Sequence, residues 1–387
     1  MMIVCGVILY DFVQNKTGFS YIDEILALII FIRYFLNSKY TTDSNNFIKC
    51  FIVFIFYLFY SLLFPNNVIP AIWNDFFIQI KPYIVFFCTY NLNFELTQKQ
   101  RKKICKLCIL LSIFFLIPIG IAGINSELMT SFGGYSRFAT MSIILGITYY
   151  YASEKNNKSL LITFTIWTIG LLSYRSKMYG FYAGAIGIFI LWNNKNFYRK
   201  NILSIKSIII VCLIATMILI VGWQKISYYF IQGTQAENTF ARPLMYQGAI
   251  MILKDHPFLG TGFGSYATYA SALYYSPLYH KYGLYLNPEV GNGLFISDTY
   301  FPALAQFGLL GITIFILFWI YLIKEAIKYY KINHNIKLLK MIILIVLCIF
   351  IESVADSTFT QNRGMAIMML LAMFLTEQKQ LIQKLHK

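Results

Sequence analysis

The chain has 387 residues, of which 58% are hydrophobic and only 12% are charged. Apolar runs of about 17 to 22 residues, the length that crosses a bilayer, recur along it and exclude an ordinary water-soluble domain. The net charge of +16 does not indicate a nucleic-acid partner, because the basic residues stand in short clusters between apolar runs, as membrane topology requires.

We predict an all-α, polytopic integral membrane protein with about twelve transmembrane helices and one long periplasmic loop. In chain order, the candidate spans are 2–13, 21–37, 47–64, 77–91, 104–123, 138–152, 159–173, 178–192, 207–222, 298–323, 339–357 and 363–376.

Loop charge predicts the orientation of these spans. With the N-terminus in the cytoplasm, most basic clusters, such as 99–103 and the C-terminal tail, fall on the inner side. This divides the chain into nine helices over 1–222, an outer loop with an amphipathic helix over 223–297, and three helices with a cytoplasmic tail over 298–387.

Three arginines run against this charge bias, on the outer side. Arg137 follows a Gly-Gly turn, Arg175 lies with Lys177 in a very short turn between two spans, and Arg242 begins the helix of the long loop. Guanidinium binds phosphate in a bidentate manner and stays ionised, which suits a diphosphate held at a lipid surface. The alternative is that these side chains anchor helix ends at the interface.

Two carboxylates and a fourth arginine lie near the chain's last outer turn. Glu352 and Asp356 are four residues apart, so they share one face of a helix, and Arg363 follows them. Carboxylates within a membrane segment are candidates for function. The alternative is an ion pair with Arg363.

The long loop contains a helix bounded by Pro243 and Pro257, then a glycine-rich run from 260 to 264. This run lacks the Gly-Lys-Ser/Thr of a phosphate-binding loop and the third spaced glycine of a dinucleotide fingerprint, so it does not indicate nucleotide binding. Its glycines allow close approach to a lipid or sugar, and tyrosines offer rings for stacking, although tyrosine is also an ordinary interface residue. We therefore expect supporting glycan or lipid contacts from Gly260, Gly262, Gly264, Tyr266 and Tyr300.

Several of these segments together resemble a known family. In chain order they are Ser173-Tyr174-Arg175, Arg242, His256 to Tyr266, Asp298-Thr299-Tyr300-Phe301 and Gln306 to Gly311. Over about residues 170–315 the chain is similar to the O-antigen polymerase and ligase superfamily (Wzy-type). Ligases of this group typically show His-Asn where this chain has Asp298-Thr299, which favours a polymerase.

The resemblance implies a GT-C-like glycosyltransferase of the bacterial inner membrane that needs no metal or cofactor. Its substrate would be an undecaprenyl diphosphate-linked oligosaccharide at the periplasmic face. Arg175 and Arg242, supported by Arg137, would hold the diphosphate, with Asp298 as first candidate for the general base and His280 as second. A chain-length regulator and a flippase are the implied protein partners.

Two other functions stay open. An O-antigen ligase or oligosaccharyltransferase would pass the glycan to lipid A core or to protein. A precursor transporter or flippase should show inverted repeats and charges at the membrane midplane, whereas the polar residues here gather at one face.

Overall fold

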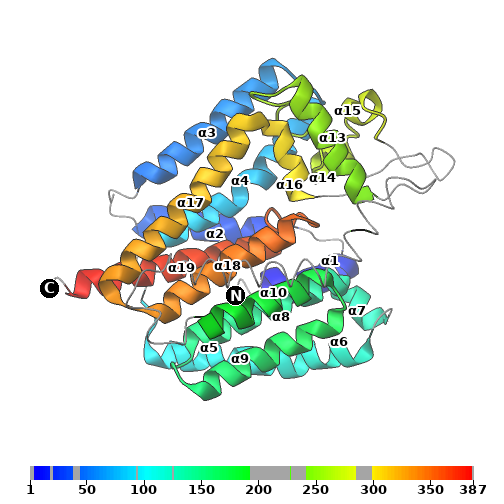
Figure 1. Ribbon diagram of the computed structural model, residues 1–387. Coiled ribbons are helices and arrows are strands. Elements are labelled where there is room, and N and C mark those ends of the chain that lie inside the picture. Colours follow the sequence, from blue (N-terminus) through cyan, green and yellow to red (C-terminus); the bar gives the residue numbers. More distant parts are fainter. Residues whose placement is uncertain are drawn as a thin grey trace.

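The computed structural model describes residues 4–17, 21–37, 44–92, 95–123, 126–191, 227, 241–284 and 299–385. Every regular element in these ranges is a helix, which confirms the all-α prediction. The helices form three layers, seen from top to bottom in Figure 1.

The upper layer contains α3 (Ser44–Leu63), α4 (Ile69–Asn91) and α17 (Gly308–Asn333). The middle layer contains α2 (Ile22–Asn37), α18 (Ile336–Ser353) and α19 (Asn362–Leu385). The lower layer contains α5 (Gln98–Leu111), the π-helical turn η2 (Ser112–Leu116), α6 (Ile117–Ala122), α8 (Gly134–Ala152), α9 (Asn157–Gly170) and α10 (Ser176–Leu191).

Shorter elements complete the described part of the chain. Near the N-terminus and in the lower layer they are η1 (Val4–Ile8), α1 (Tyr10–Thr17), α7 (Glu127–Ser131) and η3 (Leu171–Ser173). At the end of the molecule opposite the C-terminus they are α13 (Ala241–Asp255), α14 (Tyr269–Leu273), α15 (Pro277–Lys281), α16 (Tyr300–Ala303) and η7 (Leu304–Phe307).

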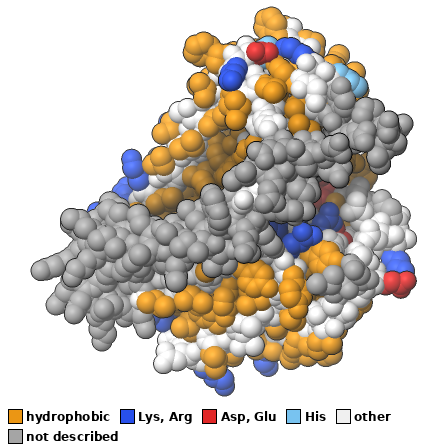
Figure 2. Space-filling model, turned by 45° about the vertical axis from the view of Figure 1, so that its right-hand side comes forward, with side chains coloured by type: hydrophobic (Ala, Val, Ile, Leu, Met, Phe, Trp, Pro, Cys, Tyr) orange, Lys and Arg blue, Asp and Glu red, His pale blue; other side chains and the backbone are white. Residues whose placement is uncertain are grey.

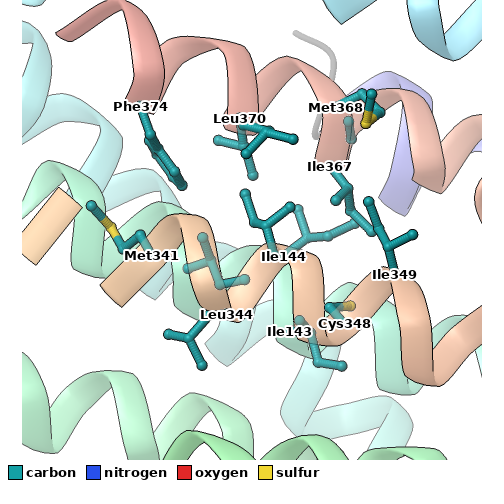
Figure 3. Close-up of a cluster of buried hydrophobic side chains, with 14 of the residues drawn as sticks. Ile143, Ile144, Met341, Leu344, Cys348, Ile349, Ile367, Met368, Leu370 and Phe374 are labelled. Carbon is teal, nitrogen blue, oxygen red and sulfur yellow. The ribbon is translucent and has the colours of Figure 1, made fainter. Parts of the chain in front are cut away.

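The largest core lies where the middle layer meets the lower one. Ile143 and Ile144 of α8 pack with Leu344 and Ile349 of α18 and with Leu370 of α19, among other aliphatic side chains (Figure 3). Residues 138–152 of α8 are buried on all sides. Such a helix has no polar face to turn to solvent, which is why its sequence is apolar almost throughout.

Three helical stretches in the described ranges are long and apolar enough to cross a membrane: Gln98–Ala122, Tyr300–Asn333 and Asn362–Leu385. A shorter apolar stretch covers Ile48–Leu63. The surface also exposes many large hydrophobic side chains, over both the upper and the lower parts in Figure 2. A membrane protein is therefore supported, but the predicted count of twelve spans is not confirmed, and the predicted span 207–222 lies outside the described residues.

Candidate functional site

Polar and charged side chains from four helices meet at the turn between α18 and α19, which we call the charged corner. The Lys177 ammonium, at the start of α10, pairs with Glu352 near the end of α18 and lies 3.1 Å from an Asp356 oxygen. The Ser136 hydroxyl of α8 donates to Asp356 at 2.6 Å. Glu352 also accepts hydrogen bonds from the Thr140 and Thr358 hydroxyls, so both oxygens of this buried carboxylate have donors.

The fourth helix is α19, whose Arg363 side chain is almost fully buried. One of its terminal nitrogens lies 3.9 Å from Asp356, and it also hydrogen-bonds Gln361. The ion pair between Arg363 and Asp356, which the sequence offered as the alternative to function, is therefore present. Lys and Arg side chains gather with acidic ones between the upper and lower parts of Figure 2.

Arg137 of α8 is also paired. Its guanidinium contacts Asp11 of α1, a carboxylate whose side chain is only 2% exposed. A buried carboxylate without a cation is costly, so this contact binds α1 to α8.

Arg175 and Arg242 differ from the three cations above. The Arg175 guanidinium is 4.9 Å from the centre of the Tyr135 ring, and Tyr135 immediately precedes Ser136. The Arg242 Nε donates to the carbonyl of Ala355 at 3.0 Å, one residue before Asp356. Among the described residues, neither has a carboxylate at ion-pair distance. Each therefore keeps its charge available at the edge of the cluster.

The three predicted arginines thus share one neighbourhood, although their binding of a diphosphate stays a prediction. The predicted bases fare differently. Asp298 lies outside the described residues. His280 belongs to α15, which is fixed to the far end of α13 because Tyr282 and Lys281 bind Asp255 at 2.8 and 3.4 Å.

The distance from Arg242 to that end of α13 is large. At about 1.5 Å per residue, thirteen residues of helix cover about 20 Å. The structure therefore separates His280 from Arg242. The hydrogen bond from Tyr282 also lowers the pKa of the Asp255 carboxyl, which favours the ionised form that pairs with Lys281.

The glycine-rich run is docked on the corner between α3 and α4. Gly260, Gly262 and Gly264 all have positive φ, of 71°, 81° and 70°. A Cβ on Gly264 would stand 2.6 Å from the carbonyl oxygen of Ala71 in α4. These glycines therefore approach protein, whereas their predicted contact with glycan or lipid stays untested.

Polar side chains of the α3–α4 corner hold this run through its backbone. Asp75 accepts from the Gly264 N–H at 2.8 Å, Ser61 accepts from the Phe263 N–H at 2.8 Å, and Asn67 donates to the Gly264 carbonyl at 2.7 Å. Tyr60 and Asn66 donate to the carbonyls of Gly260 and Thr261, each at 2.9 Å. We call residues 256–268 the docked loop.

Tyr266 is fully buried, and its hydroxyl donates to the Met245 carbonyl in the first turns of α13. It therefore connects the docked loop to the helix that carries Arg242, and its ring is not open to a sugar. Tyr300 is also buried, but it lines an apolar cavity of about 350 Å³ between α3, α4 and α17. Its backbone N–H donates to the Asp356 carbonyl at 3.4 Å, so the cavity and the charged corner are neighbours.

Sequence reasoning missed how Lys177 and Ser136 act. Lys177 was interpreted only as a possible anchor beside Arg175. The signal that could have found it is the pair Glu352 and Asp356, since two carboxylates close together in an apolar segment require more than the single cation Arg363.

These observations define a helical protein with long apolar helices, consistent with a membrane protein, and with a cluster of charged side chains at the turn between α18 and α19. A family model described as O-antigen ligase matches residues 160–316, a range that contains Arg175, Arg242 and the docked loop. The predicted resemblance to the O-antigen polymerase and ligase superfamily is thereby confirmed over that range, and it supports glycosyltransferase-like chemistry on a lipid-linked glycan. No curated protein and no solved structure matched the chain.

Proposed function

We propose that this chain is an O-antigen polymerase of the bacterial inner membrane. It would transfer the growing glycan from undecaprenyl diphosphate to a new lipid-linked repeat unit at the periplasmic face. The observation that carries the proposal is that Arg175 and Arg242 reach one charged corner without carboxylate partners in the described structure, whereas Arg137, Lys177 and Arg363 are compensated.

The chemistry requires a leaving group that takes up negative charge. As the bond between the sugar carbon and the diphosphate oxygen breaks, both guanidinium groups stabilise the departing anion. The acceptor sugar hydroxyl forms the new bond to that carbon and gives its proton to a base, for which Asp298 is our first candidate. The cavity beside Tyr300 suits part of the hydrocarbon chain of the lipid.

An O-antigen ligase is the second candidate, and the description of the matching family favours it. The two activities share the donor and differ in the acceptor, which is a second lipid-linked unit for a polymerase and lipid A core for a ligase. A chain-length regulator and a flippase remain proposed partners of the polymerase.

The test is chain extension by purified protein in liposomes, with a chelator and a lipid diphosphate-linked repeat unit of its host. We expect a ladder of products from the wild type. Arg175→Ala and Arg242→Ala should each lower the turnover by about 10²- to 10³-fold, as loss of a transition-state contact does. Lys281→Ala is the matched control, because it removes a cation that pairs with Asp255 in the same outer segment.

No ladder from a correctly folded wild type, either with chelator or with added divalent metal, would reject the polymerase, and transfer to lipid A core instead would establish the ligase. Activity that is lost with chelator and returns with a divalent metal would reject the proposed metal-independent mechanism.

A further inference from the structure

The turn that follows the end of α18 binds the helix that carries Arg242. Tyr246 donates its hydroxyl to the Val354 carbonyl at 2.9 Å, and Arg242 donates its Nε to the Ala355 carbonyl at 3.0 Å. Tyr246 and Arg242 are four residues apart and so lie on the same face of α13. Carbonyls at the end of a helix lack partners within it and favour cationic donors, which explains this contact.

The same turn also binds the element that carries Arg175. Lys177, two residues further along the chain, pairs with Glu352 and Asp356, and the side chains of Lys177 and Glu352 are only 10% and 2% exposed. Ser136, next to the ring under the Arg175 guanidinium, contacts Lys177 and donates to Asp356. Residues 352–356 therefore hold both arginine-bearing elements, and we call them the shared mount.

Binding both elements to one short segment fixes their relative positions. Residues 352–356 form the end of α18 and a tight turn, closed by hydrogen bonds from the N–H groups of Ala355 and Asp356 to the Glu352 carbonyl at 3.1 and 2.9 Å, so little motion can separate the two attachment points. Arg242 uses one of its five N–H donors for the mount, and its terminal nitrogens make no hydrogen bond within the described part of the chain. Its guanidinium is therefore held in place while most of its donors stay available.

We propose that the shared mount, with Tyr246 and Lys177 as positioning residues, sets the separation of Arg175 and Arg242 so that the site prefers two linked phosphates over one. This inference rests on the proposed function, because it assumes that both arginines bind the lipid diphosphate. A site with preset donors binds the matching anion without first ordering its own side chains. If the donors are free to move, the second phosphate adds less to the binding affinity.

The test compares farnesyl diphosphate with farnesyl monophosphate as probes, in direct binding measurements on the purified full chain in detergent. The ratio of the two affinities is the readout. We expect the wild type to prefer the diphosphate, and Tyr246→Phe to reduce this ratio roughly fivefold, the effect of one lost hydrogen bond. Monophosphate binding should change little.

Tyr282→Phe is the matched control. It removes a hydroxyl that donates to Asp255 at 2.8 Å, at the other end of the same helix, and should leave the ratio unchanged. The double variant Tyr246→Phe with Arg242→Ala should show no further loss beyond Arg242→Ala alone, because Tyr246 acts through Arg242. General destabilisation would instead add to it.

The outcomes separate the two proposals. If the wild type shows no preference for the diphosphate and Arg242→Ala changes nothing, the diphosphate site itself is rejected. A second outcome is that the preference depends on Arg242 while Tyr246→Phe shows the same ratio of diphosphate to monophosphate affinity as the control Tyr282→Phe. In that case the shared mount is rejected and the diphosphate site stands.

Discussion

Arg137 shows how a single contact in the folded protein can change the role assigned to a residue from the sequence. Arg137, Arg175 and Arg242 all oppose the charge bias, so they look equivalent in the sequence. Within the described ranges, only Arg137 of these three is paired with a buried carboxylate, Asp11. Its first contribution is therefore to stability, and the sequence could not reveal this because Asp11 and Arg137 are far apart along the chain.

We expect Arg137→Ala to destabilise the protein by about 3–5 kcal/mol, because it leaves the Asp11 carboxylate buried without a cation. Adding Asp11→Asn to this variant should recover much of the lost stability. Thermal unfolding in detergent measures both. Lys281→Ala, which breaks an exposed pair, should cost less than about 1 kcal/mol. Loss of chain extension in a fully stable Arg137→Ala protein would instead assign Arg137 to the chemistry.

Among the elements, α13 is predictable from the sequence, whereas the surroundings of the docked loop that follows it are not. The helix between Pro243 and Pro257 is confirmed as α13, because proline positions and apolar spacing are local signals. The surroundings of the glycines were not predictable, since their partners Ser61, Asn67 and Asp75 lie about two hundred residues earlier. Local rules show that a glycine allows close approach, but not what approaches.

Two glycines of this region allow a matched test. Gly264 and Gly283 have similar positive φ, of 70° and 63°, but a Cβ on Gly264 would meet the α4 backbone, whereas one on Gly283 would meet nothing within 4 Å. Both alanine variants carry a backbone cost of about 1 kcal/mol. We expect Gly264→Ala to cost a further 1–3 kcal/mol or so from overpacking.

Thermal unfolding of the two variants measures this difference, and limited proteolysis shows whether the docked loop detaches. Equal unfolding temperatures for Gly264→Ala and Gly283→Ala would contradict the docking of the loop on α4.

In the molecule as a whole, the described turns and short helices lie at two opposite ends. The C-terminus and the turn between α17 and α18 lie at one end, and α13, α14 and α15 lie at the other (Figure 1). The sequence predicts the first end to be cytoplasmic, because it carries most basic loops, including the segment of Arg101. Hydropathy and charge thus predict the general architecture, whereas the number of crossings depends on packing that they do not determine.

Single cysteines at the two ends test this orientation. In a background without the seven native cysteines, we place Phe258→Cys at one end and Leu385→Cys at the other, at side chains that are 77% and 65% exposed. A membrane-impermeant maleimide on intact spheroplasts should label Cys at 258, and should label Cys at 385 only after permeabilisation. The reverse pattern would invert the predicted topology.

The docking of the loop also has a consequence for biosynthesis. The corner between α3 and α4 emerges from the ribosome long before its partner, since Asp75 and Gly264 are 189 residues apart. At about 5–20 residues per second, the interval is roughly 10–40 s. The sequence predicts the α3–α4 hairpin to enter the membrane, where a carboxylate, two asparagines and a serine that still lack their hydrogen bonds to the docked loop are costly in lipid. The nascent chain therefore has to keep this hairpin near water, or beside an insertion factor, until the loop is made.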